Sequence, residues 1–151
     1  SSDLLAWRHA VNWVLDNYGY FDNFVSLPAT SPLRSVDDVE AALIKREEVN
    51  ADICISVTKA SRSPYFNMVV TSNDGQVNLV NPPSESLTRR QDAPPVYDIT
   101  TVVYTASPEF ILNKNGLFEG KVTSIEVPKE RAVDIDDIFD FKFAEILLKE
   151  S

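Results

Sequence analysis

The stretch ADICISVTKAS, residues 51–61, determines the predicted fold, because its apolar character is nearly continuous. A strand that is exposed on one face alternates apolar and polar side chains, whereas a strand covered on both faces is apolar throughout. Segments with helical spacing precede it at residues 3–18 and 36–49. Residues 51–61 are therefore predicted to form a strand covered on both faces.

The residues before this strand predict alternating helices and strands. An amphipathic helix is expected at residues 3–18, with both tryptophans as core anchors, and an apolar strand follows at residues 21–26. Ser35 and Asp38 form a capping box for the helix at residues 36–49. Helix, strand, helix and strand in this order imply an α/β fold with a mainly parallel sheet flanked by helices. The expected inward side chains of the first helix are Leu4, Trp7, Val11, Val14, Leu15 and Tyr18.

The pattern changes from about residue 64. Extended runs flank SNDGQ, residues 72–76, in which Asp-Gly predicts a hairpin turn. Further strands are predicted at residues 96–105 and 121–128, with a short helix at residues 107–116 between them. The apolar residues of DDIFDFKFAEILLKE, 136–150, predict a final helix packed on the sheet.

Length and charge restrict the class of protein. The 151 residues favour a single domain, and 44% hydrophobic with 25% charged residues is typical of a soluble globular protein. The net charge of -9 disfavours nucleic acid as a partner but allows a small anion in an arginine-bearing cleft. Cys54, the sole cysteine, is predicted to be buried and inert. No stretch has the apolar length of a membrane span, so a cytoplasmic location is expected, or a nuclear one in an animal.

The tetrapeptide VDID, residues 133–136, is a candidate metal site. If it is extended, Asp134 and Asp136 point to the same face. Two close carboxylates repel each other unless a cation offsets their charge, and Mg²⁺ bound together with substrate phosphate oxygens is a common solution. In the alternative interpretation, Asp136 or Asp137 only caps the final helix.

The turn PATSPLR, residues 28–34, is a candidate ligand site because it follows a strand and precedes a helix. Thr30 and Ser31 offer hydroxyl groups, and Arg34 can engage an anion with two nitrogens. The alternative is an ordinary connection with a solvated arginine.

RRQDAPPVYDITT, residues 89–101, is a third candidate. Arg89 and Arg90 offer charge for a phosphate or carboxylate, whereas Tyr97 and the nearby Tyr104 offer aromatic faces. Thr100 and Thr101 offer hydroxyls, and a solvated pair of arginines remains the alternative. The single histidine, His9, leaves no catalytic triad, so any chemistry would depend on positioning and charge stabilisation.

Three segments together resemble the acylneuraminate cytidylyltransferases, also called CMP-sialic acid synthetases. They are PATSPLRSVDDV (28–39), RRQDAPPVYDITTVVY (89–104) and VPKERAVDIDDIFDFKFAE (127–145). The resemblance implies a nucleotide-diphospho-sugar-transferase-like, Rossmann-like fold with a β-hairpin dimerisation extension, assigned to residues 64–103 of a single domain, and a homodimer. It also implies Mg²⁺-assisted attack of a nonulosonic acid on the α-phosphate of CTP, with release of pyrophosphate.

The resemblance implies roles for individual residues. Asp134 and Asp136 match the family's metal-binding aspartates, and Arg90 matches an arginine near the sugar carboxylate or phosphates, with Arg89 and Gln91 beside it. The remaining residues are expected to bind substrate: Thr30, Ser31, Arg34, Tyr97, Thr100 and Tyr104.

The sequence departs from the family in two respects. Many members have glutamine where this chain has Pro28, so the identity of the sugar is left open. The family's basic, glycine-containing CTP loop has no match here, so the chain resembles the C-terminal two thirds of an enzyme. The alternatives are a CMP-KDO-type cytidylyltransferase and a catalytically incompetent substrate-binding or dimerisation fragment.

Overall fold

The computed structural model describes residues 2–82 and 90–151, which form two compact units. The first consists of Ser1–Thr58 with Ile99–Ser151, and the second of Lys59–Asp98. The elements in chain order are α1 (Ser2–Tyr18), β1 (Phe24–Ser26), α2 (Val36–Glu48), β2 (Ile53–Lys59), β3 (Val69–Thr71), β4 (Val77–Leu79), η1 (Arg90–Asp92), β5 (Tyr97–Ala106), α3 (Pro108–Asn113), β6 (Val122–Glu126), η2 (Lys129–Arg131) and α4 (Ile138–Glu150).

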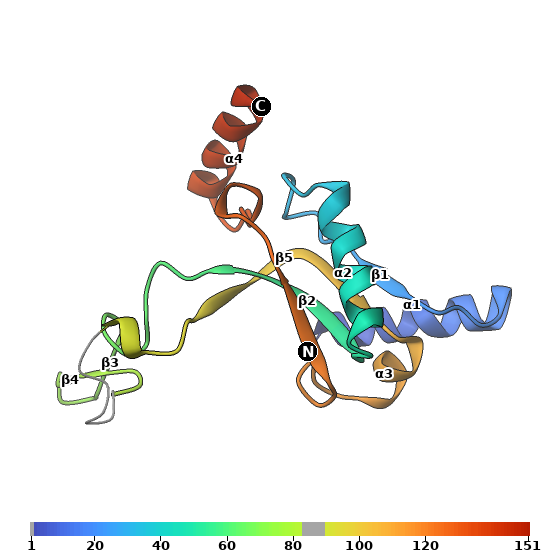
Figure 1. Ribbon diagram of the computed structural model, residues 1–151, viewed down its shortest axis with the longest axis horizontal. Helices are drawn as coiled ribbons and strands as arrows, with labels where there is room; N and C mark the ends of the chain where they lie inside the picture. Colours follow the sequence, from blue (N-terminus) through green and yellow to red (C-terminus); the bar gives the residue numbers. More distant parts are fainter. Residues whose placement is uncertain (1, 83–89) are drawn as a thin grey trace. The chain divides into compact units, whose positions relative to one another are not determined.

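The central sheet has the strand order β1-β5-β2-β6 (Figure 1). β2 pairs with β6 in parallel, and β1 pairs with β5 antiparallel. β5 also runs against β2, because Ser107 N–H donates to the Asp52 carbonyl (3.0 Å) while the earlier Val103 N–H donates to the later Ser56 Oγ (3.1 Å). Three of the four strands therefore share one direction, which confirms the mainly parallel α/β sheet, and β5 is its antiparallel member.

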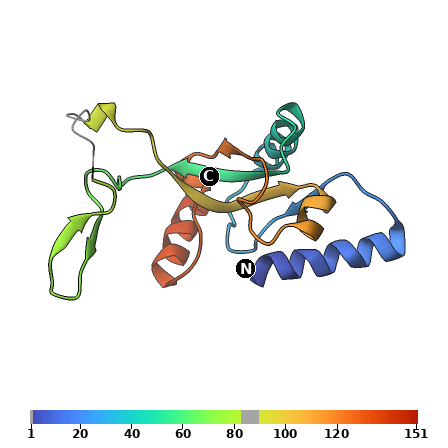
Figure 2. The same cartoon turned by 90° about the horizontal axis from the view of Figure 1, so that it is seen from below.

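Helices cover both faces of this sheet. Figure 2 shows α1 and α2 on opposite sides of it. On one face, Ile53 and Ile55 pack with buried residues of α1 and α3, and on the other face Cys54 packs with Ala42 of α2. Successive residues of β2 thus enter opposite cores, as expected for a strand whose apolar run does not alternate.

α1 packs against the sheet and α3 through only part of its predicted apolar side. Trp7 packs against Phe24 and Tyr104 at ring-centroid distances of 5.4 and 5.2 Å, and Arg8 donates to the Ile111 carbonyl at 3.0 Å. The helix ends at Gly19, whose φ of +88° is readily available only to glycine. The prediction of two tryptophan core anchors was half wrong, since the side chain of Trp13 is 52% exposed.

Tyr18 was also predicted to face the core, but it is 78% exposed. It lies against Trp13 with a ring-centroid distance of 5.7 Å. Both residues occur on the α1 side that lacks a partner element among the described residues. The apolar side of α1 that helical spacing predicts is therefore wider than the part of the helix that the sheet and α3 cover.

The predicted packing of the final helix on the sheet was wrong. Ala144, the buried residue of α4, lines a pocket with Pro32 and Ile135 and belongs to neither of the two core clusters of the sheet. Its cap is the predicted acidic type, because Asp137 accepts hydrogen bonds from Phe139 N–H and Asp140 N–H, each at 2.9 Å. The following large apolar residues of α4 are 47–74% exposed: Ile138, Phe139, Phe141, Phe143, Ile146 and Leu148.

The second unit contains the predicted hairpin. β3 and β4 pair antiparallel, with Thr71 opposite Val77, and Gly75 adopts φ +84° in the connecting turn. Gly75 N–H donates to the Ser72 carbonyl at 2.9 Å, which closes the turn. The hairpin turn predicted from Asp-Gly is therefore confirmed. A role of the hairpin in dimerisation stays a prediction.

Cys54 provides a direct test of this core. Its side chain is fully buried in β2, and burial raises the pKa of the thiol to about 11. Because the thiolate is the reactive form, we expect a soluble maleimide at pH 8 to leave the folded protein unmodified and to label it once denaturant is added. Mass spectrometry of the single cysteine reads out the result. Stoichiometric labelling under native conditions would contradict the assigned core.

Candidate active site

The turn between β1 and α2 is anchored by a buried serine. Ser31 is fully buried, and its Oγ lies 2.6 Å from Thr101 Oγ1 on β5. Thr30 Oγ1 lies 3.4 Å from the same hydroxyl. The predicted Thr30 and Ser31 therefore meet at Thr101, at the end of β1 where an open α/β sheet binds its ligands.

Arg34 links this turn to β5 by hydrogen bonds. Its Nε donates to the Val102 carbonyl at 2.8 Å, and one terminal nitrogen bonds the carbonyls of Pro28 and Thr101. Partial burial lowers the pKa of the guanidinium. The guanidinium thus joins the turn to β5 through main-chain carbonyls. Its predicted binding of a substrate anion stays a prediction.

The VDID segment lies beside the same turn. Ile135 N–H donates to the Thr30 carbonyl at 2.9 Å, which fixes the residue that follows Asp134. Val133 is buried and the Asp134 side chain is partly buried. Asp134 Oδ1 is inaccessible to solvent and accepts no hydrogen bond from the described residues. A carboxylate oxygen in such a position is unfavourable unless a cation or another donor reaches it.

The aspartates at the start of α4 form different hydrogen bonds. Asp137 is the N-cap of α4, and Asp140 Oδ2 accepts hydrogen bonds from the main-chain N–H groups of Asp136 and Asp137 at 3.0 and 3.2 Å. The exposed Asp136 side chain is not the cap of this helix. Of the two capping alternatives left open by the sequence, the structure selects Asp137.

A divalent cation is compatible with this arrangement. In the part of the chain that the structure describes, no group of three or more His, Cys, Asp or Glu side chains could hold a metal ion. Mg²⁺ does not require such a cluster, because it commonly uses one or two carboxylates and completes its shell with water and substrate phosphates. Asp134 and Asp136 supply two carboxylates, and their binding of Mg²⁺ stays a prediction.

The aromatic and hydroxyl residues of β5 occupy different environments. Tyr104 is partly buried against Trp7, and its pKa is raised by burial and by the negative charges of Asp3 and Asp134. Thr100 is only 4% exposed, and its hydroxyl donates to Ser56 Oγ at 2.6 Å. Thr100 is thus engaged inside the sheet, and its predicted substrate contact stays a prediction.

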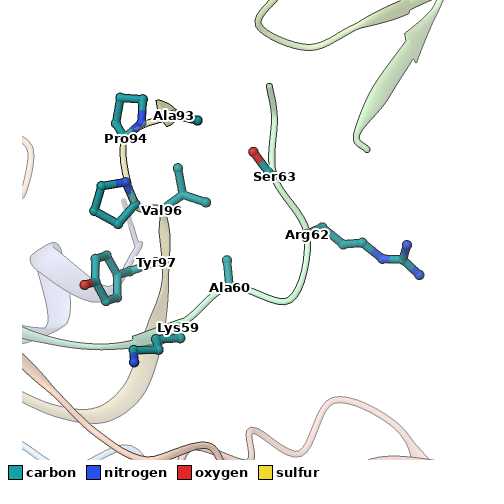
Figure 3. A pocket seen from close by; sticks show the side chains of 9 residues that line it. Lys59, Ala60, Arg62, Ser63, Ala93, Pro94, Val96 and Tyr97 are labelled. Atoms are coloured by element: carbon teal, nitrogen blue, oxygen red, sulfur yellow. The ribbon is translucent and has the colours of Figure 1, made fainter. Parts of the chain in front are cut away.

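The remaining predicted residues belong to the second unit or lie outside the described residues. Arg89 is outside them, whereas Arg90 and Gln91 begin η1. Tyr97 lines an open pocket with Lys59, Pro94 and Val96, and Figure 3 shows Arg62 pointing away from it.

Sequence reasoning did not select three residues around the turn. Thr101 was noted with Thr100 for its hydroxyl, but only Thr100 was predicted to bind substrate, although two neighbours on one strand point to opposite faces. Asp38 was recognised only as part of a capping box, and Arg131 was not considered. Asp38 also pairs with Arg131, whose Nε and NH2 lie 3.1 and 2.8 Å from its carboxylate oxygens.

Known proteins are similar to this chain in sequence or in fold, although no protein-family model matches it. Post-translational flagellin modification protein B of Campylobacter coli is 36% identical over 131 residues, covering 86% of this chain and 54% of that protein. CMP-N,N'-diacetyllegionaminic acid synthase of Campylobacter jejuni is 34% identical over 129 residues, covering 85% and 53%. N-acylneuraminate cytidylyltransferase of Streptococcus agalactiae is 24% identical over 127 residues, covering 84% and 30%.

The chain spans about half the length of the first two relatives. Among solved structures, 4-diphosphocytidyl-2C-methyl-D-erythritol synthase from Anaerococcus prevotii superposes with a TM-score of 0.58 at 13% identity, covering 85% of this chain and 59% of that one. This likeness confirms the predicted α/β fold. The sequence relatives show that the chain is related to the CMP-sialic acid synthetase family, the acylneuraminate cytidylyltransferases, over about 85% of its length.

Proposed function

We propose that the full-length protein transfers CMP from CTP to the anomeric hydroxyl of a sialic-acid-like nonulosonic acid. The observation that best supports this function is the buried, unpartnered Asp134 Oδ1 beside a hydroxyl-lined turn. The relatives include a CMP-N,N'-diacetyllegionaminic acid synthase and an N-acylneuraminate cytidylyltransferase. In the reaction, the sugar hydroxyl releases its proton to solvent and its oxygen forms a bond to the α-phosphorus of CTP. The bond from that phosphorus to the β-phosphate oxygen breaks, and pyrophosphate leaves with the electron pair.

Asp134 and Asp136 would hold Mg²⁺ in this proposal. The bound ion would neutralise negative charge on the phosphates of CTP. Asp134 offers a carboxylate oxygen that has no internal donor, and Asp136 offers an exposed carboxylate that α4 does not use as its cap. Because Asp137 supplies the cap of α4, the side chain of Asp136 is not used for capping and could bind Mg²⁺ together with Asp134.

The remaining predicted residues would bind the organic substrates. Thr30 and Ser31 would shape the edge of the cleft through Thr101, and Arg34 would hold that turn in place. Arg90, with Arg89 and Gln91, would bind anionic groups of the sugar or the phosphates. Tyr97, Thr100 and Tyr104 would contact the sugar.

A homodimer formed through the hairpin is part of the same proposal. An isolated two-stranded hairpin is marginally stable in water. Val69, Val70 and Val77 of β3 and β4 are 53–56% exposed, so the hairpin presents apolar surface that a second copy could cover.

The test of this function is pyrophosphate release by the full-length protein with CTP, Mg²⁺ and a panel of sugar acids. The panel contains N,N'-diacetyllegionaminic acid, N-acetylneuraminic acid and KDO. We expect release with a nine-carbon acid, formation of the CMP-sugar by mass spectrometry, and loss of activity with EDTA. ATP, GTP and UTP serve as controls for the nucleotide.

Each outcome of this experiment has a defined meaning. Release only with KDO would replace the proposed substrate by an eight-carbon acid. The absence of release with every acid would refute the enzymatic proposal and favour a binding or dimerisation role.

A further inference from the structure

The short segment that contains Asp134 is attached to the β1–α2 region at two points. At its carboxyl end, Ile135 N–H donates to the Thr30 carbonyl at 2.9 Å. At its amino end, Arg131 Nε and NH2 donate to the two carboxylate oxygens of Asp38 at 3.1 and 2.8 Å. Asp134 lies between these attachments, and its buried Oδ1 accepts no hydrogen bond from the described residues.

Asp38 is a rigid anchor for Arg131. It is 5% exposed at the first turn of α2, and its Oδ2 also accepts a hydrogen bond from Ser35 N–H at 3.0 Å. Ser35 directly follows Arg34, which is tied to the Val102 carbonyl. The Arg131 side chain retains 37% exposure, so the pair is desolvated mainly on the carboxylate side.

The charges of the pair are matched to this geometry. Burial alone would raise the pKa of Asp38, but the hydrogen bonds from Arg131 and Ser35 and the charge of Arg131 outweigh it and lower the pKa. Asp38 is therefore ionised when it receives the two-nitrogen contact. Two parallel hydrogen bonds restrict direction as well as distance, which a lysine at the same place could not do.

We propose that Arg131, through its two-nitrogen contact with Asp38, is a positioning residue that sets the location of Asp134 for binding a divalent cation. This inference rests on the proposed metal role of Asp134. Arg131 does not touch the cation itself. Residues that orient a metal ligand typically change metal affinity by about 10–100-fold when they are replaced, because a ligand that is free to move loses its favourable geometry.

The test uses direct titration of the full-length protein with Mn²⁺ alone, monitored by the electron paramagnetic resonance of free Mn²⁺. We expect Arg131→Met to raise the dissociation constant about 10-fold, and Arg131→Lys to give an intermediate value because it keeps charge but not the paired contact. The Mg²⁺ dependence of turnover should shift in the same order, with kcat at saturating Mg²⁺ changing less than the activation constant.

Two controls separate positioning from stability and from net charge. Arg131→Met leaves a buried Asp38 without its cation, which can compromise folding. The double variant Arg131→Met/Asp38→Asn removes both charges and retains an oxygen for the Ser35 cap. It should also bind Mn²⁺ about 10-fold more weakly, because the link to α2 is still missing. Lys149→Met removes one charge from the exposed Lys149–Glu145 pair and should bind Mn²⁺ like the wild type.

The outcomes are distinguishable. Weaker binding in a folded double variant together with unchanged binding in Lys149→Met supports the positioning role. A dissociation constant within twofold of wild type in the double variant overturns it while leaving the proposed function intact. If the wild-type protein binds no Mn²⁺, the metal role of Asp134 fails together with this inference.

Discussion

Replacing Asp134 by asparagine is expected to lower the rate of pyrophosphate release by about three orders of magnitude, a loss of about 4 kcal/mol of transition-state stabilisation. Asparagine preserves the shape of the side chain but removes the charge that would attract Mg²⁺. The expected effect is large because the buried Oδ1 has no partner among the described residues that could substitute for the ion. Steady-state kinetics of the full-length protein at saturating CTP measures it.

The same substitution should not weaken the fold. A buried carboxylate oxygen without a donor destabilises the folded state, so a neutral amide should leave the melting temperature equal or higher in the absence of metal. In wild type, Mg²⁺ with CTP should raise the melting temperature, and Asp134→Asn should abolish that increase. A lower melting temperature together with unchanged turnover would assign Asp134 a purely structural role.

Asp136 and the neighbouring cap residue Asp137 provide matched comparisons. Asp136→Asn should also reduce turnover, because Asp136 is the second proposed ligand and is not the cap. Asp137→Ala removes the cap and should cost about 1 kcal/mol of stability while retaining turnover. If Asp137→Ala proved the more damaging to turnover, the metal assignment within VDID would be wrong.

The sheet could be predicted because each of its strands has a strong local signal. β2 is apolar without alternation, and the structure places Ile53 and Cys54 in different cores. β5 was recognised as a strand, but its antiparallel direction has no local signature, since strand direction depends on tertiary pairing. β5 also departs from strict alternation, because the consecutive residues Val102 and Val103 enter the same core.

Helix prediction failed where apolar side chains exceed the surface that covers them. Tyr18 and Ile138 have the spacing of buried residues but are 78% and 57% exposed. Periodicity shows that a helix has an apolar side, but it does not show which element packs there. The same limitation explains why α4 was assigned to the sheet, whereas Ala144 packs near Pro32 and Ile135.

The candidate site was predictable by residue type but not by contact. The turn that carries Thr30 and Ser31 lies beside the segment that carries Asp134, because Ile135 N–H donates to the Thr30 carbonyl, but the substrate and metal roles of these residues stay predictions. Arg34 was expected to face a ligand, yet its contacts are main-chain carbonyls, which sequence patterns do not identify. The Arg131–Asp38 pair joins residues 93 positions apart, so it has no local signature either.

Ile53→Ala is expected to produce the largest loss of stability, about 3–4 kcal/mol. Ile53 is fully buried where β2 meets α1 and α3, and its removal would leave a cavity that close-packed neighbours fill only in part. For a chain of this size, the melting temperature should fall by roughly 10 °C. Thermal unfolding followed by circular dichroism measures the change.

Ile44→Ala is the matched control, because Ile44 is 55% exposed on α2 and loses little buried surface. Its stability should stay within about 0.5 kcal/mol of wild type. The contrast depends on β2 being covered on both faces, since an isoleucine on a half-covered strand could tolerate truncation. Equal effects of the two substitutions would show that residues 51–61 do not form the inner strand on which this fold depends.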